Sequence, residues 1–189
     1  MPWKLRKQYY RNNHSLFSLF IMATLDYKKQ LLFAGTLFTL HNLEEAIGFS
    51  NFRYPVNLPM AIRPHSAETM ILSIALITII AWALIMWANM QPKELNRRNL
   101  LIIFVSVFIA NAFFPHIAGT IVLQRYFPAV ITSVILYLPY SIWILPKLFR
   151  SYPLRNQFFL VMIGGLSLAI ILTVALHFFV NIYLKFLVS

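Results

Sequence analysis

The sequence predicts an all-α integral membrane protein, a bundle of about five transmembrane helices, and three observations support this class. Of its 189 residues, 60% are hydrophobic and 11% are charged, whereas a soluble domain carries about 25% charged residues. The apolar residues occur in blocks of roughly 20, the length of helix that crosses the hydrocarbon core of a bilayer. Prolines and basic residues lie between these blocks, where they end helices and mark connections. We therefore treat the chain as a single transmembrane domain.

Five apolar blocks define the predicted spans. They cover Gln30 to Phe49, Ala67 to Met90, Asn99 to Leu123, Phe127 to Phe149 and Gln157 to Leu187. Residues 1–29 form a basic segment before this bundle, which occupies residues 30–189. Within that segment Ser15 to Leu25 is apolar but too short to cross a bilayer, so we expect a short interfacial helix, with the apolar region of a signal-like segment as the alternative. Translation from Met22 would remove most of this segment.

The distribution of basic residues predicts the orientation. Twelve of the sixteen Lys and Arg lie in the N-terminal segment and in the second and fourth connections, and four lie on the other side. Because cytoplasmic loops are enriched in Lys and Arg, we expect the N-terminus in the cytoplasm and the C-terminus outside. Topology and anionic lipid headgroups thus explain the net charge of +11, and membrane lipids rather than nucleic acid are the expected partners.

Two adjacent carboxylates stand inside the first apolar block. Glu44 and Glu45 follow His41 by three and four residues, in a chain with only five acidic residues. An ionised carboxylate inside a membrane is costly unless a cation meets it. Positions i, i+3 and i+4 share a helix face, so His41 is expected to converge with either glutamate. This pattern indicates a functional site.

The predicted orientation brings further polar residues to the same depth, the outer half of the membrane. They are His65 and Glu68 at the second span, Asn111 and His116 on the third, Gln124, Arg125 and Tyr126 after it, and His177 and Asn181 on the fifth. Several have a structural alternative. Ser66 and Glu68 have the residue types that begin a helix, and Tyr126 suits an interfacial aromatic belt.

The residue types at this depth suit a divalent metal ion. The expected ligands are His41, Glu44, Glu45 and His116. Imidazole and carboxylate together favour zinc, iron or manganese, and the absence of cysteine excludes thiolate ligands. Neither the HExxH pattern of zinc peptidases nor a glycine-rich phosphate loop is present. Pro115, beside His116, is expected to kink the third span and open access to the site.

These elements resemble those of a known family, the HXXEE-domain proteins, which are small bacterial multi-pass membrane proteins of uncharacterised function. The resemblance rests on His41-Asn42-Leu43-Glu44-Glu45, Asn111-Ala112-Phe113-Phe114-Pro115-His116 and Tyr126-Phe127-Pro128-Ala129, in this order between Leu31 and Thr132. The Asn-Ala…His element is one residue longer than in the family's pattern, and Ala129 stands in place of a glycine. The resemblance implies a common site in a bacterial cell membrane, without implying a particular reaction.

Three functions fit these residues. The first is a metal-dependent membrane enzyme, a hydrolase or oxidoreductase acting on a lipid or other hydrophobic substrate. Glu45 or Glu68 would be its general base, while Asn111 and Tyr126 would orient the substrate or an oxyanion. The second is a cation or proton transport protein, against which the confinement of polar groups to the outer half argues. The third is a structural or immunity-type protein whose glutamates pair with Arg53, Arg63 or Arg125.

Overall fold

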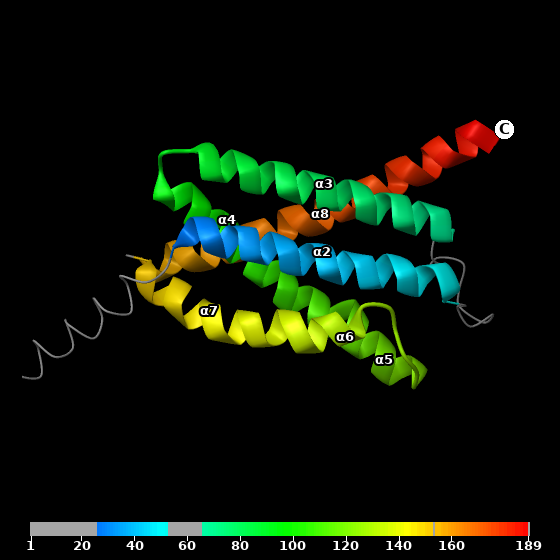
Figure 1. Cartoon of the computed structure of the whole chain (residues 1–189), viewed down its shortest axis with the longest axis horizontal. Coiled ribbons are helices and arrows are strands. Elements are labelled where there is room, and N and C mark those ends of the chain that lie inside the picture. Colours follow the sequence, from blue (N-terminus) through cyan, green and yellow to red (C-terminus); the bar gives the residue numbers. More distant parts are fainter. Residues whose placement is uncertain (1–25, 53–65, 153, 189) are drawn as a thin grey trace, which may run out of the picture.

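The computed structural model describes residues 26–52, 66–152 and 154–188, and all regular structure in these ranges is helical (Figure 1). Several expected features lie outside the described residues. They are the Ser15 to Leu25 helix with Met22, and the side chains of Arg53, Arg63 and His65.

Five long helical segments follow one another along the chain. They are α2 (Tyr27–Asn51); α3 (Ala67–Met90); a third segment of α4 (Glu94–Asn111), η2 (Ala112–Ile117) and α5 (Ala118–Leu123); a fourth of α6 (Val130–Thr132), η3 (Ser133–Tyr137) and α7 (Leu138–Ser151); and α8 (Arg155–Val188). η3 is a π-helical turn, in which hydrogen bonds join residues five apart, whereas η2 is a kink, because Phe114 inside it has a non-helical backbone. A helix is thus found at each of the five predicted places.

Four of these segments are long and apolar enough to cross a membrane, namely Ala67–Met90, Glu94–Leu123, Val130–Ser151 and Arg155–Leu184. With 25 residues, α2 has sufficient length, but His41, Asn42 and the two glutamates lower its hydropathy. In the bundle α2 lies beside α3 and packs against α3 and α4 (Figure 1). His41 and Asn42 are buried there. The less apolar helix is therefore stabilised by neighbouring helices around its polar groups.

The antiparallel arrangement gathers the predicted basic connections at one end of the bundle. The start of α2, the turn between α3 and α4 and the turn between α7 and α8 lie together there (Figure 1). Arg98 on α4 extends across this end, because its guanidinium donates to the Ser151 carbonyl at 2.7 Å and lies 4.2 Å from the Tyr152 ring centroid. These contacts tie the third segment to the end of α7.

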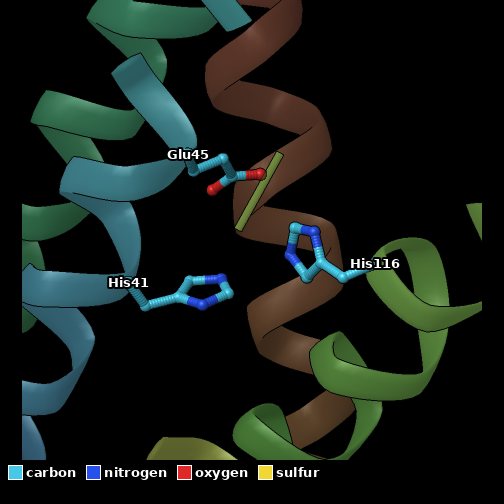
Figure 2. A group of neighbouring side chains, drawn as sticks. All are labelled: His41, Glu45 and His116. Atoms are coloured by element: carbon cyan, nitrogen blue, oxygen red, sulfur yellow. The ribbon is translucent and has the colours of Figure 1, made fainter. Parts of the chain in front are cut away.

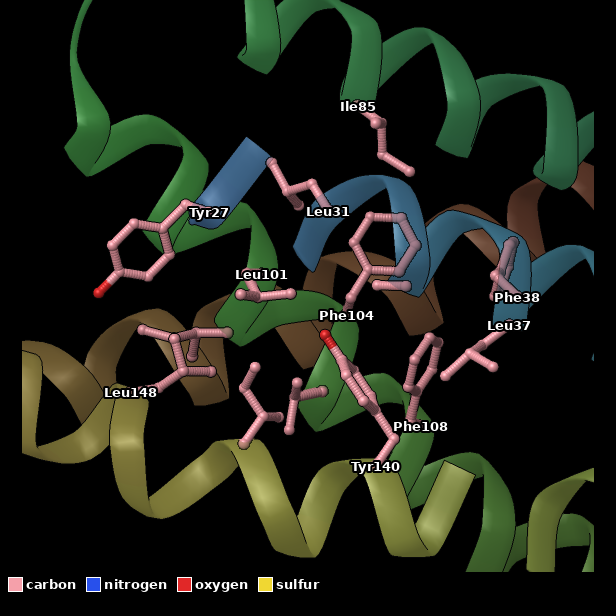
Figure 3. Packing of buried hydrophobic residues seen from close by; sticks show 14 of the residues in the cluster. Tyr27, Leu31, Leu37, Phe38, Ile85, Leu101, Phe104, Phe108, Tyr140 and Leu148 are labelled. Carbon is pink, nitrogen blue, oxygen red and sulfur yellow. The ribbon is translucent and has the colours of Figure 1, made fainter. Parts of the chain in front are cut away.

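An aromatic and aliphatic core joins α2, α4 and α7 (Figure 3). The Phe38 ring of α2 meets the Phe104 ring of α4 edge-on at 5.8 Å between centroids, and Leu31 and Leu101 are fully buried. Since lipid tails are as apolar as these side chains, close van der Waals packing rather than water exclusion holds such helices together. The packed core positions the middle of α2, where the polar residues begin.

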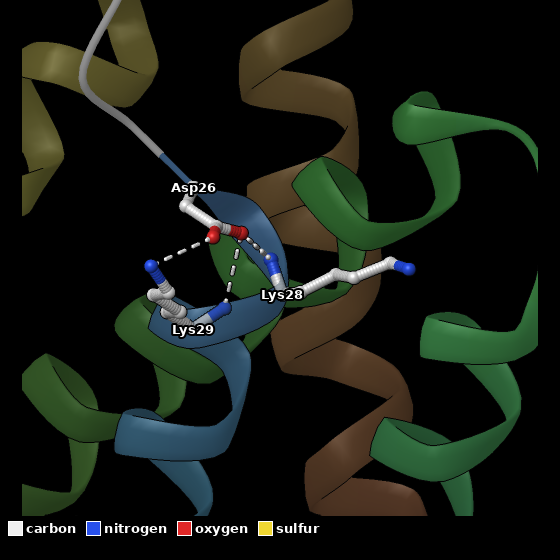
Figure 4. A network of polar contacts seen from close by, with 3 residues as sticks. All are labelled: Asp26, Lys28 and Lys29. Atoms are coloured by element: carbon white, nitrogen blue, oxygen red, sulfur yellow. Dashed lines mark hydrogen bonds and ion pairs between the residues drawn. The ribbon is translucent and has the colours of Figure 1, made fainter.

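Asp26 caps the N-terminus of α2 (Figure 4). Its Oδ1 accepts hydrogen bonds from the backbone nitrogens of Lys29 at 3.3 Å and Lys28 at 3.1 Å. The Lys29 Nζ lies 3.5 Å from Oδ2. These contacts, the backbone hydrogen bond from Lys29 foremost, lower the pKa of Asp26. The ionised carboxylate therefore stabilises the start of this helix.

We expect Asp26→Asn to lower the melting temperature at neutral pH. Because the folded pKa is depressed, the charge stabilises the fold above the unfolded pKa of about 3.9, and that contribution disappears as the pH falls through the folded value. Thermal unfolding of both proteins in detergent at neutral pH and at about pH 3 tests this. A difference of the same size at both pH values would contradict the assignment.

Gly165 allows α8 to approach α4 closely. A Cβ placed on Gly165 would overlap the Ile103 side chain, whose own Cβ would be 3.0 Å away, whereas one on Gly164 would meet nothing within 4 Å. The two adjacent glycines on one helix therefore differ completely in their surroundings. Small residues at such crossings let membrane helices pack backbone to backbone.

We expect Gly165→Ala to lower the free energy of unfolding by about 1–3 kcal/mol, because the added methyl group overpacks the interface. Gly164→Ala is the matched control and should leave stability unchanged or raise it by up to about 1 kcal/mol through helix propensity. Thermal unfolding of the two detergent-solubilised variants measures the difference. Equal responses would show that α8 does not contact α4 at Gly165.

Candidate metal site

Three of the predicted site residues, His41, Glu45 and His116, meet inside the bundle (Figure 2). Each offers one ligand atom, and the three atoms lie within 4.8 Å of one another. His41 and Glu45 are one turn apart on α2, and His116 comes from η2. Both histidines are fully buried and Glu45 is half-buried. A mixed imidazole and carboxylate set of this kind can bind a metal ion.

Both ring nitrogens of His41 have hydrogen-bond partners. The Asn111 Nδ2 lies 3.0 Å from Nε2, and the Thr132 Oγ1 lies 3.0 Å from Nδ1. With the Asn111 amide donating to Nε2, the neutral ring carries its proton on Nδ1 and donates it to Thr132. The lone pair then resides on Nε2, the nitrogen that would be available to a metal ion once Asn111 yields it.

The ring of His41 is also held by aromatic contacts. Tyr137 stacks on it with centroids 4.2 Å apart and planes 23° apart. The His116 ring meets it edge-on at 4.8 Å. The Phe108 ring in turn stacks on Tyr137, with ring centroids 3.9 Å apart. His41 is therefore fixed in position as well as in its protonation pattern.

His116 differs from His41 because neither of its ring nitrogens has a hydrogen-bond partner. The Pro128 carbonyl faces the ring but lies outside hydrogen-bond geometry. A buried polar atom without a partner costs about 1–3 kcal/mol, and native structures retain such atoms mainly where they have a further role. The unpaired nitrogens next to His41 and Glu45 are consistent with a ligand position.

The kink within η2 brings Asn111 and His116 to the same side of the third segment, where both face His41. These residues are five apart, a spacing that a regular α-helix directs to different faces. Phe114, with φ −136° and ψ 118°, interrupts the helix, and Pro115 follows it. The predicted kink beside His116 is confirmed.

The π-helical turn η3 completes the surroundings of His41 from the fourth segment. Thr132, just before η3, bonds the ring, and Tyr137, five residues later at its end, stacks on it. η2 and η3 also pack against each other. Two irregular turns on neighbouring segments thus supply the contacts to one histidine.

Glu44 is not one of the three clustered ligands and caps the fourth segment. Its Oε2 accepts from the backbone nitrogen of Thr132 at 2.8 Å, and its Oε1 accepts from that of Ile131 at 3.3 Å and from the Tyr126 hydroxyl at 2.7 Å. The first N–H groups of a helix lack partners within the helix. Glu44 of α2 supplies an acceptor for these groups, so the two glutamates of the motif face different neighbours.

Ala129 starts the capped helix in a left-handed conformation, with φ 62° and ψ 12°. Glycine adopts this conformation without steric cost, whereas alanine is strained by its Cβ. A glycine at this position would adopt the same conformation without that strain. Gly48 of α2 lies against the same turn, since a Cβ on it would be 2.6 Å from the Pro128 Cβ.

Tyr126 precedes this turn and is 44% exposed. Partial burial, and then its hydrogen bond to the Glu44 carboxylate, raise the pKa of Tyr126 to about 12. The phenol therefore remains protonated at neutral pH and donates to Glu44. Its contact is with the capping carboxylate rather than with the histidine pair.

No ion pair joins either glutamate to a basic side chain in the described ranges. Arg125 places its guanidinium 4.6 Å from the Phe52 ring centroid. Within the described ranges, the ion pair that is present joins Lys29 to Asp26. Arg53 and Arg63 lie outside the described residues. The carboxylate of Glu45 thus approaches two imidazoles without a basic side chain to compensate it.

The remaining predicted residues are placed as follows. Glu68 is exposed in the first turn of α3, next to the capping Ser66, and is not among the residues brought together. His177 lines a cavity with Glu45 and Asn111, and its Nδ1 lies 2.8 Å from the Thr173 carbonyl oxygen. The sequence did not identify Thr132 and Tyr137 as contacts of His41. Both lie in an apolar stretch without a motif, and their approach to His41 depends on η3.

A cavity of about 200 Å³ adjoins the cluster. Residues of α2, α3, α4 and α8 line it, and Glu45 belongs both to this lining and to the cluster. Asn42 also lines the cavity and donates to the Thr78 hydroxyl at 2.6 Å. The site therefore has an adjoining space that can hold a small molecule.

The fold and site define a helical membrane protein with a buried His/His/Glu cluster. A family model described as "Protein of unknown function with HXXEE motif" matches residues 32–144, and the chain belongs to this family. It is also similar to the uncharacterized protein YrkK of Bacillus subtilis (strain 168), with 25% identity over 111 residues, 59% of this chain and 69% of that protein. No solved structure matches.

We expect Glu44→Ala to lower the free energy of unfolding by about 2 kcal/mol or more, because three donors lose a charged acceptor. Glu45→Ala, at the neighbouring carboxyl group, should be neutral or stabilising in metal-free protein, because it removes a half-buried acidic group that no basic side chain in the described ranges pairs with. Thermal unfolding in detergent with chelator compares the variants. The reverse order would contradict the capping role.

Proposed function

We propose that this protein is a metal-dependent membrane enzyme, a hydrolase or oxidoreductase acting on a lipid or other hydrophobic substrate. The observation that carries the proposal is the convergence of His41, Glu45 and His116 within 4.8 Å. It is supported by the unpaired nitrogens of His116 and by the lack of a basic partner for Glu45 in the described ranges. A divalent ion would satisfy all three groups at once.

The geometry is close to that of a three-ligand centre. Ligand atoms at 2.0–2.2 Å around a tetrahedral ion are roughly 3.4 Å apart, so small side-chain rotations would bring atoms now within 4.8 Å into position. Three protein ligands leave one position for water or substrate, as in catalytic zinc sites. Zinc, iron and manganese all suit imidazole and carboxylate ligands.

The surrounding residues suggest distinct roles. Thr132 fixes the His41 ring through Nδ1, an interaction that typically changes metal affinity by 10–100-fold when it is lost. Asn111 presents its amide beside the ring and the cavity, where it would orient a polar group of the substrate. Glu45 has two oxygens, so one can hold the ion while the other accepts a proton, the general-base role. Glu44 supports the site by capping the start of the fourth segment, and Tyr126 donates a hydrogen bond to this capping carboxylate.

We further propose that the protein is a multi-pass protein of the cell membrane, with the N-terminus in the cytoplasm and the site in the outer half. The distribution of Lys and Arg supports this orientation. Cation or proton transport is a weaker alternative. The cavity beyond Glu45 is lined by apolar side chains such as Ile80, Leu84 and Ile103, which offer no polar path onward.

We expect about one divalent ion per chain in purified protein, and near-complete loss of it in His41→Ala, Glu45→Ala and His116→Ala, because each removes one of three ligands. Elemental analysis of detergent-purified protein after dialysis measures this. His177→Ala is the matched control, a histidine at the same cavity outside the cluster, and should retain the metal. Sub-stoichiometric metal that none of the three substitutions alters would refute the metal site.

A further inference from the structure

The cavity beside the cluster has the size of a small ring compound. Its volume is about 200 Å³, whereas an engineered protein cavity of roughly 150 Å³ binds benzene. Pockets for drug-sized ligands begin at roughly 300 Å³. The cavity therefore admits a molecule slightly larger than benzene and is too small for a whole membrane lipid.

Most side chains around this space are apolar, among them Ile77, Ile80 and Leu172. Apolar cavities of this size favour carbon groups over water. No Lys or Arg is among the described residues that line it, so an anionic ligand would find no basic partner there. The body of the ligand is therefore expected to be an uncharged ring or short hydrocarbon.

The polar side chains of the lining offer mainly acceptors, because much of their donor capacity is used. Asn111 directs its Nδ2 to the His41 ring, and its side-chain oxygen remains an acceptor. Asn42 does the same with its Nδ2 on the Thr78 hydroxyl. Glu45 forms no hydrogen bond or ion pair within the described ranges, and an ionised carboxylate only accepts. A polar group that matches these oxygens is a donor.

The α8 side of the lining follows the same pattern, and α3 adds a hydroxyl that is not committed. Thr173 Oγ1 donates to the Ala169 carbonyl at 2.9 Å. The Ser73 hydroxyl is buried without a hydrogen-bond partner among the described residues, and a hydroxyl can donate or accept. A ligand hydroxyl suits both kinds of neighbour, because it donates and accepts, whereas a protonated amine only donates.

We propose that the cavity binds a small uncharged alcohol or phenol, about as large as benzene with one or two substituents, whose hydroxyl donates to Glu45. Its hydrocarbon part lies against the apolar side chains of α3, α4 and α8. This inference names the substrate class of the proposed function and rests on it, because Glu45 is also one of the three clustered ligands.

The probe is para-cresol, and the readout is the methyl NMR signal of Met70, which lines the cavity. Full-length protein with isotope-labelled methionine methyl groups is titrated in detergent micelles, as purified and after chelation, and Met70→Leu assigns the signal. Met90 is 80% exposed and does not line the cavity, so it reports partition of the probe into the micelle. We expect a saturable shift at Met70 and a linear one at Met90. Linear responses at both would overturn the proposal.

The role of the hydroxyl is tested with Glu45→Ala in chelated protein, so that loss of metal does not contribute. We expect para-cresol to bind about tenfold more weakly, because a hydrogen bond to a charged acceptor is lost. Toluene, which lacks the hydroxyl, should not bind more weakly. Comparing two proteins with one compound cancels its partition into detergent. Equal losses for both compounds, or saturable binding of the cation benzylammonium that depends on Glu45, would contradict the assigned class.

The location is tested by filling the cavity from α8. Ala169→Phe should abolish the saturable shift, since Ala169 lines the cavity. Ala175→Phe is the matched control, because Ala175 lies on the same helix, is exposed and does not line the cavity, and it should bind like the wild type. Equal binding by the two variants would place the probe elsewhere. The comparison with toluene decides independently of whether Ala169→Phe folds.

Metal content measured on the as-purified samples separates this inference from the proposed function. Metal retained without saturable binding of para-cresol refutes only the ligand. Absence of metal from every sample, with binding that still responds to Glu45→Ala and Ala169→Phe, refutes the metal site and leaves a cavity that binds a small hydroxyl compound.

Discussion

The burial of His41 is the constraint on which the arrangement of the other helices depends. A fully buried imidazole needs partners for both nitrogens, and these come from two different segments, Asn111 on the third and Thr132 on the fourth. Both segments depart from regular α-helix where they reach the ring, the third by a kink at η2 and the fourth by the π-turn η3, and these two turns pack against each other. π-turns are frequent at functional sites. Here the two turns allow residues five apart to contact one side chain.

The two adjacent glutamates divide two tasks that the sequence pattern places together. Glu45 turns toward the histidines and the cavity, while Glu44 turns toward the helix start at Thr132. Successive positions on a helix are about 100° apart, which directs the two adjacent carboxylates to different neighbours here. The motif therefore combines a ligand position with a structural cap. The cap also holds Thr132, which in turn positions His41. Glu44 therefore supports the site to which Glu45 contributes.

Much of this arrangement follows from sequence, and the remainder has identifiable physical causes. Apolar blocks and connections predicted five helices in the right places, and helical spacing predicted that His41 would converge with a glutamate. Spacing alone left the choice between Glu44 and Glu45 open, since i+3 and i+4 share a face. The roles of Thr132 and Tyr137 depend on η3, and π-turns carry no periodic signal. The low hydropathy of α2 reflects the site itself, because its polar residues are the ones that the other helices enclose.

The capping of α6 by Glu44 has a consequence for the order of membrane assembly. Until α2 is docked, the N–H groups of Ile131 and Thr132 lack the acceptor seen here, and lipid offers no substitute. Conversely, α2 carries polar groups that disfavour its residence in lipid alone. Neither helix reaches its final environment without the other. During biogenesis α2 is thus expected to remain near the translocon or the interface until the fourth segment emerges, so that the two enter the bilayer as a pair.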